Sequence, residues 1–160
     1  MNPSAPCFLL VDDHALFRTG LGMMLAEHWP EAVMRHAGDW AQALSSARAL
    51  RPAPDLVLLD IQLPDGHGLD NLAQLQALLP DCPVLLMSAQ VDAERLAQAQ
   101  QRGAAGLMAK VASAREIVTA VRAALSGTPT FAMASPLPRP EPIRVPRGGA
   151  FADESLDALS

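Results

Sequence analysis

The sequence predicts an α/β protein with a doubly wound, five-stranded parallel sheet and five helices. Five short strand candidates, four of them apolar, alternate along the chain with five segments whose apolar residues recur at helical spacing. Such alternation is typical of parallel strands joined by crossover helices. Residues 56–60 begin with four consecutive apolar side chains, as expected of a strand covered on both faces. Right-handed crossovers and the need to cover both faces favour an open, doubly wound sheet, and we expect it to be flavodoxin-like, with strand order 2-1-3-4-5.

The first expected elements are a strand, an acidic turn and a helix. Residues 7–11 form an apolar run that leads into Asp12 and Asp13. Residues 15–27 follow with apolar side chains at helical spacing. A weaker strand candidate covers residues 31–37.

The middle of the chain repeats this order. A helix is expected over residues 38–50, and Pro52 ends it. The buried strand over residues 56–60 comes next and delivers a carboxylate at its end. Proline and glycine then favour a loop over residues 64–68, and leucines at helical spacing predict a helix over 69–79.

The last expected elements complete the sheet. Residues 83–88 form an apolar strand, and a polar, glutamine-rich helix follows over 92–102. A short strand over 105–108 ends near Lys110. The final helix, residues 113–125, opens with the Ser-x-x-Glu pattern of a capping box.

Composition limits the classes of partner. The net charge of −5 and the pI near 5.2 argue against nucleic acid or an anionic membrane as the direct partner. No apolar run approaches the ~20 residues of a membrane helix, and no signal-type segment opens the chain, so a cytoplasmic protein is expected. Residues 1–131 are expected to form one domain. Residues 132–160 are rich in proline and are expected to be a linker.

The two cysteines do not suggest a disulfide. Cys7 and Cys82 are expected on strands separated by a third strand, which is too far for a bond between them. Lysine usage is more informative, because eleven of the twelve basic residues are arginine and Lys110 is the one lysine. A lysine where every other basic residue is arginine suggests that this position needs a compact point charge.

Five polar side chains stand at the expected carboxyl ends of the strands: Asp12, Asp13, Asp60, Ser88 and Lys110. These ends meet at one edge of a parallel sheet. Two carboxylates ~4 Å apart repel by about 4 kcal/mol at an effective dielectric constant of about 20, so the acids would bind protons or a cation. An incomplete cage of oxygen ligands favours Mg²⁺ or Mn²⁺ over zinc.

The same residues suit phosphoryl transfer to a carboxylate. Asp60 is the candidate nucleophile, and Lys110 and Ser88 would hold phosphoryl oxygens beside the metal. Each residue alone has a structural alternative. Asp12 or Asp13 could cap a helix, Asp60 could be a turn residue, Ser88 could cap the next helix, and Lys110 could be a solvated charge. Their occurrence together at four strand ends favours the functional interpretation.

Several segments resemble one family. Residues 9–18 read LLVDDHALFR, residues 63–66 read LPDG shortly after Asp60, Ser88 is followed by alanine, and residues 103–106 read GAAG ahead of Lys110. Over residues 7–127 the chain resembles the receiver domain of two-component response regulators. The opening motif most resembles the subfamily that carries a C-terminal helix-turn-helix of the LuxR/NarL type.

The resemblance implies a role for each matching residue. Asp60 would be the phosphoacceptor, receiving its phosphoryl group from a sensor histidine kinase or a small phosphodonor. Ser88 would move toward the attached phosphoryl group, and Lys110 would pair with it. The chain would not be an enzyme acting on a separate substrate, because phosphotransfer and autodephosphorylation would occur on Asp60 itself.

The resemblance also implies a ligand set for Mg²⁺. Asp13 and Asp60 would bind the ion directly, Asp12 mainly through water, and Gln62 through its backbone carbonyl. His14 is expected to shape the start of the helix and not to bind the metal, since Mg²⁺ prefers oxygen.

The sequence says less about how phosphorylation would be passed on to an effector or partner. Leu107 stands where receivers often carry an aromatic residue that moves on activation, and the chain has no tyrosine. We expect residues 132–160 to lead to an effector domain absent from this sequence, through which alone DNA would be bound. A homodimer would use the first and last helices, and no membrane contact is expected. The alternative is a stand-alone receiver that acts through protein contacts or as a phosphate sink.

Other classes fit less well. A flavin-binding protein on this fold would need a phosphate loop after the first strand, where Asp12 and Asp13 would repel the phosphate. A phosphatase of the haloacid dehalogenase type would carry a second aspartate where Gln62 stands. A degenerate, unphosphorylated receiver is disfavoured because the key residues are all present.

Overall fold

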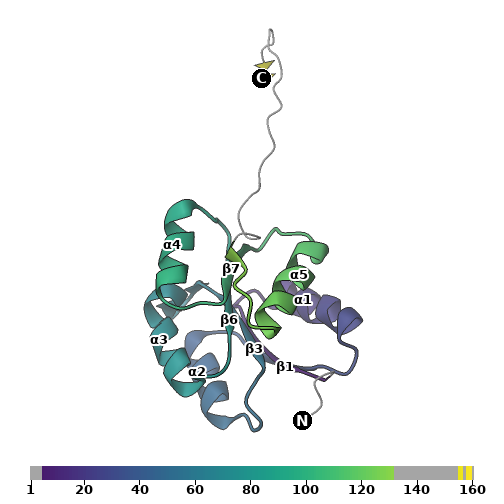
Figure 1. Ribbon diagram of the computed structural model, residues 1–160, viewed down its shortest axis with the longest axis vertical. Helices are drawn as coiled ribbons and strands as arrows, with labels where there is room; N and C mark the ends of the chain where they lie inside the picture. The colour runs from purple at the N-terminus through teal and green to yellow at the C-terminus, as the bar shows by residue number, and fades with distance from the viewer. Residues whose placement is uncertain (1–4, 132–154, 157, 160) are drawn as a thin grey trace.

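The sheet has the predicted architecture. The computed structural model describes residues 5–131, 155–156 and 158–159. Its main sheet has the order β2-β1-β3-β6-β7, and all four neighbouring pairs are parallel (Figure 1). In chain order these strands are β1 (Cys7–Val11), β2 (Val33–Ala37), β3 (Leu56–Asp60), β6 (Val84–Ser88) and β7 (Gly106–Ala109). Numbered among themselves they give the order 2-1-3-4-5, so the predicted fold class is confirmed.

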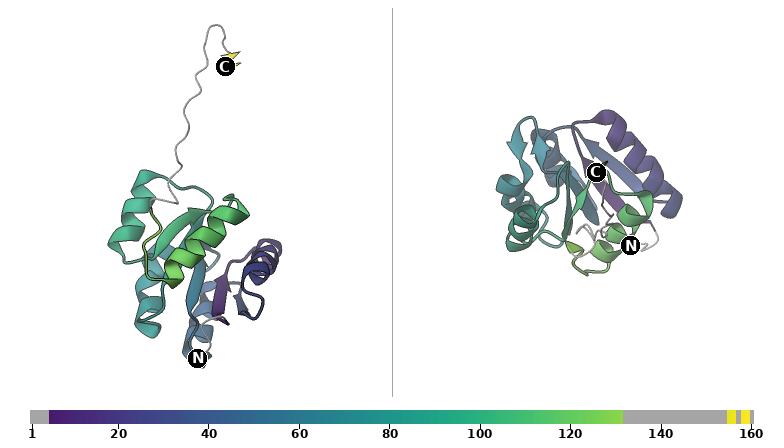
Figure 2. Two further views of the ribbon diagram at one scale, coloured as in Figure 1. Left: turned by 45° about the vertical axis from the view of Figure 1, so that its right-hand side comes forward. Right: turned by 90° about the horizontal axis from the view of Figure 1, so that it is seen from above.

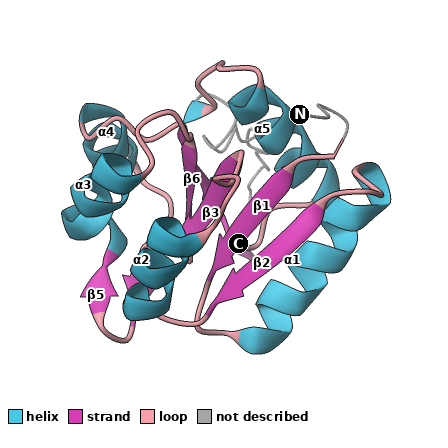
Figure 3. Cartoon of the chain, turned by 90° about the horizontal axis from the view of Figure 1, so that it is seen from below, coloured by secondary structure: helices cyan, strands magenta, loops and turns pink. Residues whose placement is uncertain are grey.

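Five helices cover the two faces of the sheet. They are α1 (Ala15–His28), α2 (Trp40–Ala49), α3 (Gly68–Leu78), α4 (Ala93–Gln101) and α5 (Ala114–Leu125). Figures 2 and 3 show α1 and α5 on one side of the sheet and α2, α3 and α4 on the other. Each face therefore has its own apolar core.

The central strand β3 explains the apolar run that preceded Asp60 in the sequence. Val57 and Leu59 pack into the core beneath α2, α3 and α4, whereas Leu56 and Leu58 pack beneath α1 and α5. All four side chains are fully buried. A strand covered on both faces must be apolar along its length, so a carboxylate can stand only where the strand ends.

The segment expected as a loop after β3 contains a short hairpin. Strands β4 (Gln62–Leu63) and β5 (Gly66–His67) pair antiparallel across a tight turn. The carboxylate of Asp65 accepts hydrogen bonds from the backbone N–H groups of Trp40 (2.7 Å) and Ala41 (3.0 Å) at the start of α2. These bonds fix the hairpin, and the hydrogen bond from Trp40 lowers the pKa of Asp65.

Gly68 allows the chain to return closely to β3. A Cβ atom at this position would lie 2.8 Å from the Cα of Ile61, and the Gly68 N–H donates to the Ile61 carbonyl at 2.6 Å.

The β4–β5 hairpin was not predicted from the sequence. Its strands have two residues each, which is too short for a strand pattern to be recognised in a sequence.

Helix ends follow the sequence signals. Asp39 caps α2 by accepting from the Gln42 N–H at 2.8 Å. The predicted capping box of α5 is confirmed, because Ser113 Oγ accepts from the Glu116 N–H at 3.2 Å and Glu116 Oε1 accepts from the Ser113 N–H at 2.8 Å.

Residues 128–131, which we call the β7 strap, cross the amino-terminal end of β7. The Thr130 N–H donates to the Ala105 carbonyl at 3.0 Å, and Phe131 packs against the core beneath α3 and α4. A Cβ atom on Gly106 would lie 1.6 Å from Thr130 Oγ1, so the buried Thr130 side chain occupies the space beside this glycine.

Both cysteines are free thiols, as predicted. Cys7 begins β1, but Cys82 lies in the loop before β6 and not on a strand. Burial raises the pKa of Cys82 to about 12, so this thiol is protonated and inert at neutral pH.

Strands β8 (Ser155–Leu156) and β9 (Ala158–Leu159) pair with each other. The linker expected over residues 132–160 falls almost wholly outside the described residues. Among the described residues, no helix is long and apolar enough to cross a membrane.

Candidate functional site

The polar residues predicted from the sequence lie at one edge of the sheet. Asp60 ends β3 and Ser88 ends β6, while Asp12 and Lys110 come directly after β1 and β7. Parallel registers place these ends level with one another, because Val11 pairs with Leu59 and Ser88 pairs with Ala109. The fold thus assembles the site from residues almost one hundred positions apart.

Three carboxylates gather at this edge. One ligand atom from each of Asp12, Asp13, His14 and Asp60 lies within 4.8 Å of the others. Asp12 and Asp60 are buried, whereas the Asp13 side chain is 36 % exposed. Buried like charges at this separation require compensation, which an ammonium group provides.

Lys110 is the compensating charge. Its Nζ atom lies 2.6 Å from Asp12 Oδ2 and 3.2 Å from Asp60 Oδ2, and it sits 4.6 Å from the centroid of the Phe17 ring. Burial alone would lower the pKa of Lys110, but hydrogen bonds and charges from the two aspartates outweigh burial and raise the pKa. Lys110 is therefore a fixed positive charge at neutral pH.

The Asp60 carboxylate is held from both sides. Its Oδ1 atom accepts from the Gln62 N–H at 3.0 Å, and its Oδ2 atom faces Lys110. Burial raises the pKa of Asp60, and the charge of Asp12 adds to this effect, although the bonds from Gln62 and Lys110 oppose it. The group is oriented, and its ionised form is destabilised.

The charge balance fits a divalent cation. Three carboxylates contribute −3 and Lys110 contributes +1, which leaves −2 among the groups of the cluster. Asp12 Oδ2 is buried, and among the described residues the Lys110 ammonium 2.6 Å away is the cation that balances its charge. Carboxylate oxygens whose negative charge is not neutralised by other groups are the ligands that Mg²⁺ and Mn²⁺ prefer.

Two predicted residues lie at the border of the cluster. Ser88 Oγ donates to the Gln90 carbonyl at 2.6 Å and accepts from the Gln90 N–H at 3.1 Å, so the hydroxyl is bonded to the β6–α4 loop and not to Asp60. Gln62 contributes its N–H to Asp60, and the role of its carbonyl as a metal ligand stays a prediction.

Sequence reasoning missed two contacts. His14, set aside as a helix-start residue, places Nδ1 within 2.9 Å of Asp12 Oδ1 and 3.2 Å of Asp13 Oδ1. Arg18, one turn into α1, donates to the Asp12 backbone carbonyl and to the ring of His36. The signal for His14 was its position beside two acids.

The substituted switch position is part of the core. Leu107 is fully buried beneath α3 and α4. The side chain at this position is aliphatic, so the aromatic movement that the resemblance implies has no ring to carry it here.

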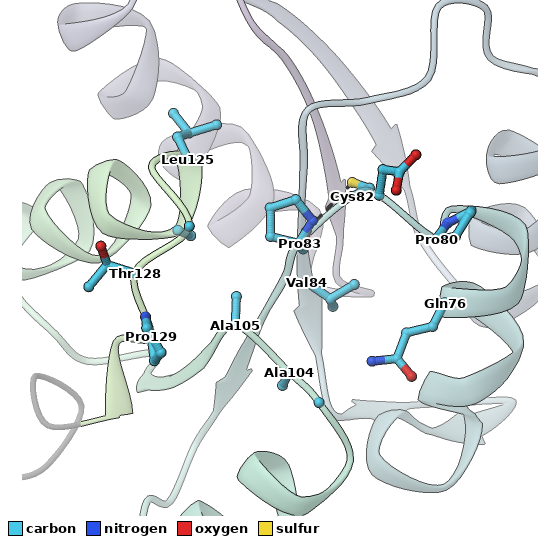
Figure 4. Close-up of a pocket in the computed structure, with 14 residues that line it drawn as sticks. Gln76, Pro80, Cys82, Pro83, Val84, Ala104, Ala105, Leu125, Thr128 and Pro129 are labelled. Carbon is cyan, nitrogen blue, oxygen red and sulfur yellow. Dashed lines mark hydrogen bonds between the residues drawn. The ribbon is translucent and has the colours of Figure 1, made fainter.

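Two hollows in the surface lie away from the carboxylates. They have volumes of about 560 and 590 Å³ and share the loop before β6 as a wall. Figure 4 shows the first, where Pro83, Val84 and Ala105 mark the amino-terminal ends of β6 and β7 and Pro129 belongs to the β7 strap. None of the carboxylate cluster lines either hollow, so shape alone would not locate the site.

Comparison with known proteins gives a consistent result. Residues 8–122 match the response regulator receiver domain. The transcriptional activator protein ExaE of Pseudomonas putida is 35 % identical over 119 residues, which cover 74 % of this chain and 55 % of that protein. The DNA-binding transcriptional activator DevR/DosR of Mycobacterium tuberculosis is 34 % identical over 113 residues, covering 71 % and 51 %. The chain spans about half the length of the curated relatives it matches.

Solved structures agree with this result. The receiver domain of NarL from Mycobacterium tuberculosis is 33 % identical with a TM-score of 0.66, covering 77 % of this chain and 98 % of that one. A response regulator from Burkholderia pseudomallei, solved with a phosphorylated aspartic acid, is 27 % identical with a TM-score of 0.66, covering 76 % and 69 %.

Proposed function

The chain belongs to the response regulator receiver domain family, and from this premise we propose that Asp60 is its phosphoacceptor. The donor would be the phosphohistidine of a sensor histidine kinase, or a small acyl phosphate. The observation that carries the proposal is the setting of Asp60 between the Gln62 N–H and the Lys110 ammonium, with Asp12 beside it.

The reaction needs little covalent machinery. A carboxylate oxygen of Asp60 attacks phosphorus, the bond from phosphorus to the donor nitrogen breaks, and the leaving imidazole takes a proton from water. The product is an acyl phosphate. Because the donor is already activated, the receiver contributes orientation and charge stabilisation.

Asp12, Asp13 and Asp60 would hold Mg²⁺ or Mn²⁺, with the Gln62 carbonyl as a further ligand. When bound, the ion neutralises charge on the transferring phosphoryl oxygens. Support for this assignment comes from the −2 balance of the cluster and from the burial of the Asp12 carboxylate, whose Oδ2 atom has only the Lys110 ammonium beside it among the described residues.

Lys110 and Ser88 would act after transfer. Lys110, now shared between two carboxylates, would pair with a phosphoryl oxygen. Ser88 would reach the phosphoryl group only after breaking its hydrogen bond to the Gln90 carbonyl. That exchange would move the β6–α4 loop, which is the route of the signal if Leu107 stays in the core.

The output would be transcriptional. The relatives named above are transcriptional activators, and the chain covers only about half their length. We propose that residues 132–160 link the receiver to a DNA-binding effector, and that α1 and α5 mediate a homodimer in the cytoplasm. A stand-alone receiver that acts by protein contacts or as a phosphate sink is the alternative, and the full-length gene distinguishes the two.

Acetyl phosphate with Mg²⁺, followed by intact-mass measurement, tests the phosphoacceptor. The wild-type chain should gain one phosphoryl group that hydroxylamine removes, and Asp60→Asn should gain none. Asp81→Asn, which changes an exposed aspartate away from the site, is the matched control and should behave as wild type. Labelling of Asp60→Asn to the wild-type extent would refute the assignment.

A further inference from the structure

The histidine that follows the two acids faces into the carboxylate cluster. His14 precedes α1 at the N-cap position with an extended backbone (φ −92°, ψ 96°). Its N–H donates to Asp12 Oδ1 at 2.7 Å, which fixes the residue against the buried acid. The side chain is 64 % exposed, yet Nδ1 is one of the four ligand atoms lying within 4.8 Å of one another.

The surroundings of Nδ1 make contradictory demands. Asp12 Oδ1 at 2.9 Å and Asp13 Oδ1 at 3.2 Å require a proton on this nitrogen. The Lys110 ammonium at 3.1 Å requires a lone pair there instead. One ring nitrogen cannot satisfy both. A metal cation resolves the conflict, because it accepts the Nδ1 lone pair and the carboxylate oxygens together, and the exposed side of the ring can carry the proton on Nε2.

A second observation points to a cation at the same place. Asp12 Oδ2 is buried, and among the described residues the Lys110 ammonium 2.6 Å away is the group that balances its charge. The exposed fraction of the Asp12 side chain is 1 %. If Lys110 moves toward a phosphoryl group, a bound cation must take over from it in balancing the charge of Asp12.

The remaining histidines are engaged elsewhere. The ring nitrogen of His67 accepts from the Leu69 N–H, that of His36 accepts from Arg18, and that of His28 contacts the Met24 carbonyl. Among the described residues, His14 alone places nitrogen among carboxylates.

We propose that His14 is a nitrogen ligand of the divalent cation site, and that the site binds borderline transition metals such as Mn²⁺ and Co²⁺ in preference to Mg²⁺. The inference rests on the proposed function, since it takes the cluster of Asp12, Asp13 and Asp60 to be the cation site. Imidazole adds affinity for first-row transition metals, whereas Mg²⁺ selects oxygen ligands and retains its waters.

Pulsed electron paramagnetic resonance of the Mn²⁺-loaded chain tests this directly. A directly bound imidazole gives ¹⁴N modulation of the electron spin echo, which should be present in wild type and absent in His14→Phe, where the ring has no lone pair. His28→Phe removes an exposed histidine far from the cluster and should keep the modulation. Thermal unfolding confirms that each variant is folded.

Isothermal titration calorimetry measures the affinity of each variant for each metal and so tests the proposed selectivity. His14→Phe should weaken Mn²⁺ and Co²⁺ binding by about tenfold or more while changing Mg²⁺ affinity by less than about threefold. The inference is overturned if the wild type shows no ¹⁴N modulation, if His14→Phe retains it, or if all three metals weaken equally.

The two proposals fail separately. Acetyl phosphate labelling of Asp60 with Mg²⁺ does not require a nitrogen ligand, so it would persist if His14 does not bind metal. Conversely, ¹⁴N modulation without any phosphoryl adduct would contradict the phosphoacceptor role and leave the His14 ligand established.

Discussion

Replacing Asp60 with asparagine should stabilise the metal-free chain at neutral pH. Burial and the charge of Asp12 raise the pKa of Asp60, so its ionised form is disfavoured in the folded state. Asparagine keeps an acceptor for the Gln62 N–H and removes the charge. A functional carboxylate is thus expected to cost stability.

The distances from Asp60 to the neighbouring charges give the size of the expected stabilisation. At an effective dielectric constant of about 20, each like charge within 4.8 Å costs at least about 3.5 kcal/mol, and an opposite charge at 3.2 Å gains about 5 kcal/mol. Asp12 and Asp13 together therefore outweigh Lys110 by at least about 2 kcal/mol. The exposure of Asp13 reduces this excess, whereas the burial of Asp60 adds to it, so we expect a gain on the order of 2 kcal/mol in the free energy of unfolding.

The pH dependence has a definite sign. A carboxyl group whose pKa is raised by folding binds its proton more tightly in the folded state, so stability falls as pH rises from the unfolded pKa, about 3.9, to the raised folded pKa. The advantage of Asp60→Asn should appear across that interval and stay constant above it. Below the unfolded pKa the two proteins should be equally stable.

Urea unfolding in EDTA at several pH values measures this difference. Asp81→Asn, with an exposed carboxylate, is the control and should match the wild type. Adding Mg²⁺ should stabilise the wild type more than Asp60→Asn, because a ligand stabilises the state that binds it. An Asp60→Asn chain that is less stable than wild type at pH 7 in EDTA would refute the electrostatic reasoning.

Three further substitutions test other parts of the structure. Gly106→Ala should destabilise the chain by about 1–3 kcal/mol in urea unfolding, because the new Cβ would overlap Thr130 Oγ1. Adding Thr130→Gly in a double variant removes that side chain and should relieve most of the loss. Lys110→Met should lower stability in EDTA by about 3 kcal/mol, since two buried carboxylates lose their counterion, and Mg²⁺ should restore part of that stability. An unchanged urea midpoint would contradict this expectation. Ser113→Ala should cost about 1 kcal/mol in thermal unfolding by removing the α5 cap, and no loss would mean that the capping box is energetically idle.

The sequence predicted the sheet because its signals are local and repeated. Four of the five strands are apolar at consecutive positions, β2 with Arg35 and His36 being the exception, and the strand ends are marked by a polar residue or a turn. The convergence of Asp12, Asp60 and Lys110 then follows from the geometry of parallel sheets, with no knowledge of side-chain positions.

What the sequence could not predict depends on contacts between distant or short segments. The β4–β5 hairpin is held by Asp65 bonding to α2, and the β7 strap by Thr130 filling the space beside Gly106. Rotamers are equally invisible in a sequence. Neither the turn of the Ser88 hydroxyl toward Gln90 nor that of His14 Nδ1 toward the acids could be inferred from residue spacing.

The most direct test of the central claim is chemical localisation of the phosphoryl group. After incubation with acetyl phosphate and Mg²⁺, borohydride reduces an aspartyl phosphate to homoserine, which tandem mass spectrometry locates in the peptide. We predict homoserine at position 60, at no other aspartate, and only when phosphodonor and Mg²⁺ are both present. Homoserine at Asp12 or Asp13, or at no aspartate when the folded chain has been exposed to both, would contradict the assignment of Asp60 as the phosphoacceptor.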